Sequence, residues 1–175
     1  MEFRELIAER RSVRKYEEAA GHDALVSILK EAQRAPSWKN LQASRCYVVE
    51  TPEELENFRA AVLPSFNQNS SAKAALIVTT YVRDLVGFSG GRPDNEIGNG
   101  WGAYDLGLHD AYLVLAAQNA GYDTLIMGIR DADAIRTRLG IPENEEIMSV
   151  IAVGKGRESP ALRPRKALEE VTCFY

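Results

Sequence analysis

Two runs of this sequence are apolar over almost their whole length, and they limit the folds that the chain can adopt. They cover residues 74–82 and 147–153, and two shorter runs at 45–50 and 124–127 have a similar composition. A strand with one solvated face alternates apolar and polar residues, whereas a strand covered on both faces is apolar throughout. The sequence therefore predicts a central sheet between two layers of helices.

Five helices are predicted around these strands. The best-marked start is Thr51-Pro52-Glu53-Glu54, which combines an N-cap residue, a proline at the first helical position and a capping-box glutamate. Periodic apolar residues and terminal glycines or prolines delimit the others. The predicted helices cover residues 2–11, 22–34, a stretch from 51 onward, 101–119 and 131–140.

Length and composition indicate a single domain over residues 1–175. The chain is 45% hydrophobic, which is enough for a real core. No internal repeat is visible. The glycine-rich segment 84–100 is the one long irregular stretch, and we favour a mobile lid there over a disordered loop.

The basic residues of this acidic chain are unevenly placed. With a net charge of −4, the chain gathers seven of its 21 Lys and Arg into two clusters near opposite ends. The N-terminal basic cluster is Arg10, Arg11, Arg14 and Lys15, and the C-terminal basic cluster is Arg163, Arg165 and Lys166. If the fold brings the clusters together, their guanidinium groups match the oxygens of a phosphate monoester. The alternative is two separate, solvated surface clusters.

The neighbours of the N-terminal basic cluster favour an anion site. Phe3, Leu6 and Ile7 fall at helical spacing, so Arg10 is expected to continue a buried stripe, where a cation is costly unless an anion meets it. Ser12 adds a hydroxyl between the arginines.

A second polar group follows the helix predicted at 22–34. Pro36 ends that helix, and Ser37, Asn40 and Gln42 then offer hydroxyl and amide groups that can bind a planar heterocycle. Trp38 adds a possible stacking face. The alternative is an ordinary polar loop with one exposed Trp.

Other motifs carry less weight. Ser89 lies in a G-x-S-x-G pattern typical of hydrolases, but the residues after it predict a turn where that motif needs a helix. Asp105 and His109 share one helical face and could begin a metal site, yet no third ligand is evident, so we expect no metal. A hydrogen-bonded pair within a packing face is the simpler interpretation. No phosphate-binding glycine motif of a nucleotide-binding fold is present.

Compartment and partners follow from what the chain lacks. Cys46 and Cys173 show no paired spacing, so no disulfide framework is expected. No apolar run is long enough for a membrane span, and the start has no leader pattern, so a cytoplasmic protein is expected. The low pI of about 5.3, with clustered basic residues, argues against nucleic acid as a partner.

The motifs occur in an order that resembles the FMN-dependent nitroreductase family over nearly the whole chain. R-R-S-V-R-K-Y begins at Arg10, A-P-S-x-x-N-x-Q begins at Ala35, a glycine follows a strand at Gly128, and R-P-R-K begins at Arg163. The resemblance implies an α+β fold, an α/β/α sandwich with a mixed, mostly antiparallel sheet flanked by helices. It also implies a homodimer with an exchanged C-terminal strand.

The same resemblance implies which residues hold FMN at the subunit interface. Arg10, Arg11 and Ser12 would bind the phosphate and ribityl groups, with Arg163 and Arg165 closing from the other side. Arg14 would lie near the pyrimidine edge. Met127 and Gly128 would present backbone to the ring near N5, beside Ile126. The other subunit would contribute Pro36, Ser37, Trp38, Asn40 and Gln42, and Gln68 is carried over from the polar residues before the strand at 74–82.

The implied activity is that of an NAD(P)H oxidoreductase. NADH or NADPH would reduce the flavin, which would then reduce nitroaromatics, quinones or similar electron-poor acceptors by ping-pong hydride transfer through N5. No side chain stands out as catalytic, since the flavin carries the chemistry. The alternative is a flavin-binding relative without this activity, such as a flavin carrier or a flavin-fragmenting enzyme. The apolar residues 171–175 lack a local partner and suit addition to another subunit's sheet.

Overall fold

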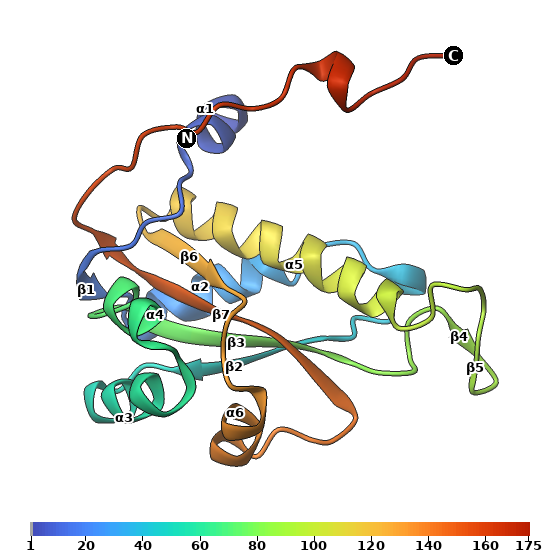
Figure 1. Cartoon of the computed structure of the whole chain (residues 1–175), viewed down its shortest axis with the longest axis horizontal. Coiled ribbons are helices and arrows are strands. Elements are labelled where there is room, and N and C mark those ends of the chain that lie inside the picture. Colours follow the sequence, from blue (N-terminus) through green and yellow to red (C-terminus); the bar gives the residue numbers. More distant parts are fainter. Residues whose placement is uncertain (1) are drawn as a thin grey trace.

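A five-stranded sheet forms the centre of the molecule (Figure 1). The computed structural model describes residues 2–175. Strand β7 pairs with β1, β3 and β6, and β3 pairs in turn with β2, always antiparallel. In the described chain, the one parallel contact is a bridge between Ser12 and Thr124. The strands are β1 (Tyr16–Ala19), β2 (Ser44–Val49), β3 (Ala75–Val82), β6 (Asp123–Met127) and β7 (Glu145–Gly156).

Helices cover both faces of the sheet, as its apolar strands predict. On one face lie α2 (His22–Ala32) and α5 (Gly100–Asn119), packed against Ile77 and Ile151 of the sheet. On the other face, α3 (Pro52–Val62) and α6 (Ala132–Leu139) pack against Leu76 and Val78. Successive residues of β3 point to opposite faces, so its unbroken apolar run serves both cores.

All five predicted helices are present, with ends that differ from the prediction by a few residues. Several short elements were not predicted from the sequence: α4 (Ser65–Ser70), strand β1, the two strands within residues 84–100, and two single turns, η1 (Trp38–Asn40) and η2 (Leu168–Glu170). None of the residues 2–175 belongs to a helix long and apolar enough to cross a bilayer.

The first helix corrects one expectation. α1 (Phe3–Glu9) has no buried residue, and Phe3 and Ile7 are 66% and 50% exposed. The predicted buried stripe is therefore wrong for the single chain, and Arg10 is half-buried at the end of α1 instead of inside a core. Although α1 touches α5, the described residues 2–175 leave Phe3 and Ile7 of its apolar face largely uncovered.

The tail after β7 leaves the domain and ends far from it (Figure 1). Residues 171–175 form no strand here, and Val171, Phe174 and Tyr175 are exposed. The expected terminal strand is thus not formed within one chain. Its exchange between two copies stays a prediction.

The segment 84–100 is folded into a projecting hairpin. Its strands are β4 (Phe88–Ser89) and β5 (Arg92–Pro93). Two hydrogen bonds between Asp84 and Asn99 close its base. Ser89 thus lies in a hairpin strand with no helix after it, which removes the context a hydrolase nucleophile needs. A lid function of this hairpin remains a prediction.

Candidate functional site

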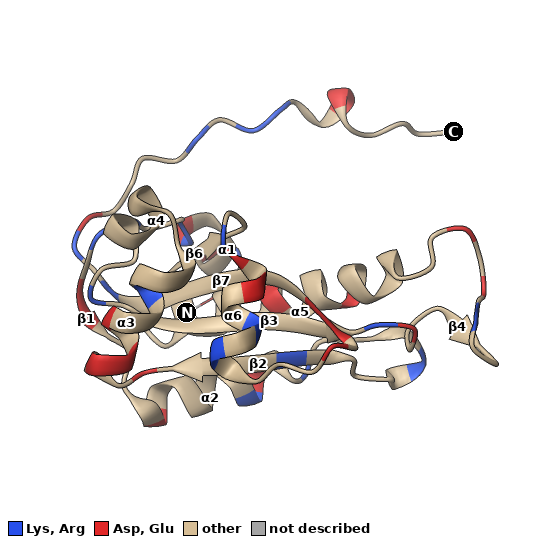
Figure 2. Cartoon of the chain, turned by 60° about the horizontal axis from the view of Figure 1, so that its bottom comes forward, with Lys and Arg blue, Asp and Glu red and all other residues tan. Residues whose placement is uncertain are grey.

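The five arginines of the two basic clusters line one pocket of about 250 Å³, which we call the arginine pocket, whereas Lys15 and Lys166 are not among its lining residues. The tail that supplies its C-terminal side carries several Lys and Arg, coloured blue in Figure 2, before the acidic turn η2. The lining residues are Arg10, Arg11, Ser12, Arg14, Pro160, Ala161, Leu162, Arg163 and Arg165.

Strand pairing explains why segments so far apart in sequence meet. β1 pairs with the end of β7, so Tyr16 lies opposite Gly156, and the N–H of Arg157 donates to the carbonyl of Lys15 at 2.8 Å. The chain that leaves β7 consequently passes the segment that precedes β1. The antiparallel end of the sheet thereby builds the arginine pocket.

The charges of this pocket have no carboxylate partners. Within residues 2–175, none of its five arginines forms an ion pair, although the neighbouring Lys15 binds Glu158 at 2.7 Å. Arg14 Nη1 donates to the carbonyl of Ser12 at 3.2 Å, and Arg11 Nη1 to that of Arg10 at 2.9 Å. Five guanidinium groups held together repel one another, and a phosphate dianion would relieve that repulsion. The donor set therefore fits the phosphate of FMN.

An open stretch of backbone lies farther along β6, the strand that the segment before β1 contacts at Thr124. The N–H of Val13 donates to the carbonyl of Thr124 at 3.0 Å, which places the segment before β1 along β6. At the end of β6 the Met127 side chain is buried in the core, whereas Ile126 and Gly128 are exposed. A Cβ added to Gly128 would meet nothing within 4 Å. Backbone, and not the methionine side chain, is thus what this segment can offer a planar ligand.

Asn67, and not the predicted Gln68, is the residue of α4 whose side chain reaches the segment after β6. The Asn67 amide is buried and donates to the carbonyl of Ile129 at 2.9 Å, next to Gly128. The Gln68 amide instead donates to the carbonyl of Leu63 at the end of α3. Little in the sequence pattern distinguishes Asn67 from its neighbours, because it lies in a short polar helix without apolar periodicity.

The loop of residues 36–42 is strained and firmly held. Lys39, Asn40 and Gln42 have φ angles of 49°, 56° and 50°, a region that side chains other than glycine seldom adopt. Such conformations persist only when the surroundings enforce them, and they cluster at functional sites.

Contacts with α5 enforce this shape. The N–H of Trp38 donates to Asp105 Oδ2 at 2.8 Å, and the Trp38 and Trp101 rings lie 4.8 Å apart. Within the loop, the N–H of Gln42 donates to Ser37 Oγ at 3.1 Å. Asp105 is itself buried, so it holds the loop from inside the fold.

One chain does not bring this loop to the arginine pocket. The loop contacts the start of α5, whereas the arginine pocket lies near its other end, where Asp123 binds the N–H of Gly156. A helix of 20 residues spans about 30 Å. The residues predicted to act from the other subunit, Pro36, Ser37, Trp38, Asn40 and Gln42, are thus remote from those predicted to act within the chain.

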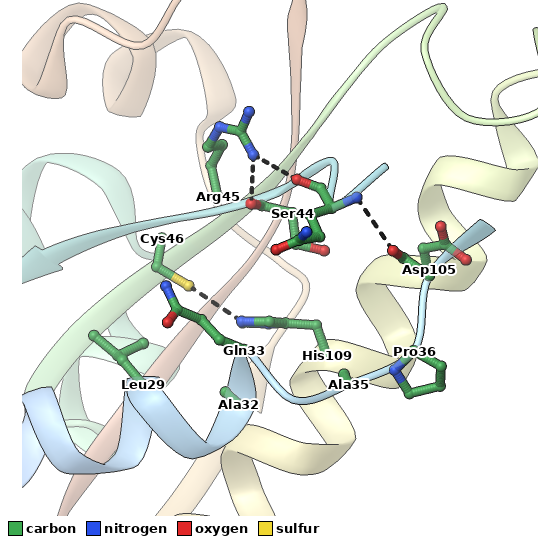
Figure 3. A pocket seen from close by; sticks show the side chains of 12 residues that line it. Leu29, Ala32, Gln33, Ala35, Pro36, Ser44, Arg45, Cys46, Asp105 and His109 are labelled. Atoms are coloured by element: carbon green, nitrogen blue, oxygen red, sulfur yellow. Dashed lines mark hydrogen bonds between the residues drawn. The ribbon is translucent and has the colours of Figure 1, made fainter. Parts of the chain in front are cut away.

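A second pocket, of about 370 Å³, opens beside the loop, and we call it the loop pocket (Figure 3). Asp105 and His109 both line it, which confirms that they share one face of α5. They do not bond to each other, because His109 binds Asp110. No group of three or more His, Cys, Asp or Glu within residues 2–175 is placed to hold a metal ion.

Comparison with known proteins agrees with this geometry. The model of the Nitroreductase family matches residues 7–85 and 89–155. The chain belongs to this family.

Individual relatives are similar over most of their length. The YdgI protein of Bacillus subtilis, provisionally named as an NAD(P)H nitroreductase, is 25% identical over 90% of both chains. A protein of Thermus thermophilus named NADH dehydrogenase is 26% identical over 94% of this chain and 92% of its own. A nitroreductase-like crystal structure from Exiguobacterium sibiricum, solved in complex with FMN, superposes with a TM-score of 0.84 at 22% identity. It covers 100% of this chain and 98% of the other. The α+β nitroreductase fold is thereby confirmed.

Proposed function

We propose that this protein is an FMN-dependent NAD(P)H oxidoreductase that works as a homodimer. The observation that carries the proposal is the arginine pocket, whose five arginines lack carboxylate partners and whose N-terminal segment runs along β6, the strand that leads to the open backbone of Gly128. Family membership supports the same conclusion, as do the FMN complex of the Exiguobacterium relative and the NAD(P)H-linked name of the Bacillus one.

The arginine pocket would hold the phosphate end of the coenzyme. Arg10 and Arg11 approach from the N-terminal side, and Arg163 and Arg165 from the tail. Guanidinium groups bind phosphate oxygens in pairs of parallel hydrogen bonds, so opposed arginines fix orientation as well as affinity. The Ser12 hydroxyl is available to the ribityl chain.

The ring would lie along the end of β6. There the exposed Ile126 leaves part of the sheet uncovered, and Gly128 allows close approach of a planar ring to the backbone. Asn67 fixes the carbonyl of Ile129 and so holds this segment in place. Arg14 supplies a positive charge that favours an anionic reduced coenzyme.

When bound, FMN would accept a hydride from NADH or NADPH and pass it to an electron-poor acceptor such as a nitroaromatic or a quinone. The chain would orient the ring, stabilise charge on it and leave one face open to both substrates in turn. Because both substrates would use the same space, one must leave before the other binds, and we expect ping-pong kinetics.

Three unpartnered surfaces support a dimer. The apolar face of α1 is exposed, and the outer edge of β2 pairs with no strand of the described chain. The apolar tail residues 171–175 are also exposed and could pair with such an edge in a second copy. A symmetric exchange of tails would cover these surfaces and bring the loop of residues 36–42 to the partner's coenzyme.

An absorbance spectrum of the purified protein, before and after anaerobic addition of NADH or NADPH, tests the proposal. We expect the spectrum of oxidised flavin, bleached on addition of the nicotinamide. A colourless protein that does not take up added FMN would contradict the proposal. A yellow protein that neither nicotinamide bleaches would instead indicate a flavin carrier or a flavin-fragmenting enzyme.

A further inference from the structure

The loop pocket contains a chain of chemical groups that flavin chemistry does not require. Cys46 of β2 and His109 of α5 line the pocket, and Asp110 of α5 and Thr79 of β3 lie behind His109, so the chain of groups draws on three elements that pack against one another. Figure 3 shows the Cys46 sulfur directed at the His109 ring.

The distances form a continuous relay. Cys46 Sγ lies 3.9 Å from His109 Nε2, and His109 Nδ1 lies 3.2 Å from Asp110 Oδ1. Asp110 Oδ2 accepts a hydrogen bond from Thr79 Oγ1 at 3.0 Å, so the carboxylate is fixed at both oxygens. A carboxylate facing Nδ1 keeps the proton on that nitrogen, which leaves Nε2 free to accept a proton from the thiol. This is the arrangement of nucleophile, base and orienting acid found in triads.

The pocket gives this relay access to a ligand. Its volume of about 370 Å³ suits a molecule of one or two rings. Leu29 and Ala32 contribute apolar groups to its lining, while Gln33, Asp105 and Arg45 contribute polar ones. Because the charged lining residues are one carboxylate and one guanidinium, a neutral ligand suits the pocket better than a charged one does.

We propose that the loop pocket is a thiol-addition site, in which Cys46 adds to neutral carbon electrophiles of the quinone or enone class with His109 as the base. The addition itself needs no flavin. Within one chain the loop pocket is remote from the arginine pocket, although its lining includes Pro36, Ser37 and Gln42 of the loop that the proposed dimer brings to the partner's coenzyme.

The addition balances without an oxidant or reductant. His109 Nε2 takes the thiol proton as Cys46 Sγ forms a bond to the β-carbon of the electrophile and its C=C π bond breaks. The electron pair moves to the α-carbon and the carbonyl oxygen, and the imidazolium returns the proton to the resulting enolate. Asp110 stabilises the imidazolium in between.

The resting thiol explains why a base is needed. Burial, aided by the negative charge of Asp110, raises the pKa of Cys46 to about 12. The charged or titratable groups that face the thiol are His109, Asp110 and Asp105, with Arg45 at the rim. A thiolate is therefore scarce at neutral pH, and reaction requires proton removal in the same step, as for the hydroxyl of a serine nucleophile.

The two cysteines of the chain make the test clean, because each can be removed to observe the other. The purified protein is treated with N-ethylmaleimide, a small neutral α,β-unsaturated imide that takes up thiols by the same conjugate addition as an enone. Adducts are followed by intact mass in Cys173→Ser, Cys46→Ser and Cys173→Ser/His109→Gln. We expect one adduct on Cys46 in Cys173→Ser, formed roughly 100-fold more slowly after His109→Gln, since general bases contribute on that scale. Addition to the exposed Cys173 in Cys46→Ser should be unaffected when His109→Gln is added.

A pH profile separates a base from a merely structural histidine. In Cys173→Ser, the Cys46 rate should change little between about pH 7.5 and 9, whereas an unassisted thiol of such high pKa gains about tenfold per unit. Three results would each overturn the proposal. The first is that Cys46 fails to react in the folded protein, the second is that His109→Gln leaves the rate of Cys46 addition unchanged, and the third is that this rate rises tenfold per pH unit in Cys173→Ser. If His109→Gln fails to fold by circular dichroism, the profile of Cys173→Ser decides alone.

Discussion

The two ends of α5 differ in whether the charged side chains beside them have partners. Near its C-terminal end, the arginine pocket holds five arginines that bind no carboxylate of the described chain. In its N-terminal half and at its middle, carboxylates have partners: Asp105 accepts a hydrogen bond from the N–H of Trp38, and Asp110 binds both His109 and Thr79. Unpaired charge indicates a place for a missing ligand, whereas satisfied groups indicate a shape that is already fixed. The contrast predicts that substitutions at the first end act mainly on coenzyme binding, and those at the second mainly on the fold.

The largest effect is expected from removing two opposed arginines. Arg10→Ala with Arg165→Ala should weaken FMN binding by roughly a hundredfold to ten-thousandfold, since each charged hydrogen bond contributes about 1.5–3 kcal/mol. The coenzyme-free protein should not lose stability, because the substitution relieves repulsion. Flavin fluorescence titration and thermal unfolding measure the two quantities. Arg138→Ala, on the exposed side of α6, is the matched control. Unchanged FMN affinity in the double variant would remove the basis for the contrast.

Shortening the tail should come next in size. Deletion of residues 171–175 is expected to lower dimer stability and flavin retention together, because the exposed apolar residues there lose their proposed partner surface. Light scattering coupled to size exclusion, with absorbance of the eluted peak, follows both. A full-length protein that elutes as a monomer with complete flavin occupancy would contradict the proposed dimer.

A smaller effect is expected at Arg14. Arg14→Ala should weaken FMN binding, and reduced FMN should lose roughly tenfold more affinity than oxidised FMN, which lowers the two-electron potential by about 30 mV. Potentiometric titration of the flavin-loaded variant measures this. If the potential stays at the wild-type value, Arg14 serves the phosphate alone.

The smallest effect on binding is expected at the other end of α5. Asp105→Asn replaces a charged acceptor of the Trp38 N–H by a neutral one and should lower the free energy of unfolding by about 1 kcal/mol. FMN affinity should fall only a few-fold through the loosened loop. Urea unfolding and flavin titration test both, with the exposed Asp94→Asn as control. A loss of flavin as large as that of the arginine double variant would erase the difference between the two ends.

The sequence was informative where one residue pattern has one physical solution. The unbroken apolar runs predicted a sheet covered on both faces, and β3 serves two cores in that way. The two basic clusters predicted that distant segments meet around an anion, and five of their arginines do line one pocket, while its binding of an anion stays a prediction. Because like charges placed close together repel one another, an anion site is one of few arrangements that account for such clusters.

Other elements were not predicted correctly, because tertiary contacts and not the local sequence determine them. β1 carries Glu17 and Glu18 in four residues, so only its pairing with β7 makes it a strand. α4 lacks apolar periodicity altogether. The stripe of α1 was correctly seen as apolar but wrongly taken as buried, since a sequence does not say whether the covering surface belongs to the same chain.

The tail of residues 157–175 joins two tasks in one segment, because it supplies Arg163 and Arg165 and then the exposed apolar residues of the terminus. In the proposed dimer, subunit association and phosphate binding would both depend on the position of this one segment. Dilution would then release coenzyme and partner in step, and added FMN would in turn drive assembly by mass action. Holoenzyme content would become a function of how much of the protein the cell makes.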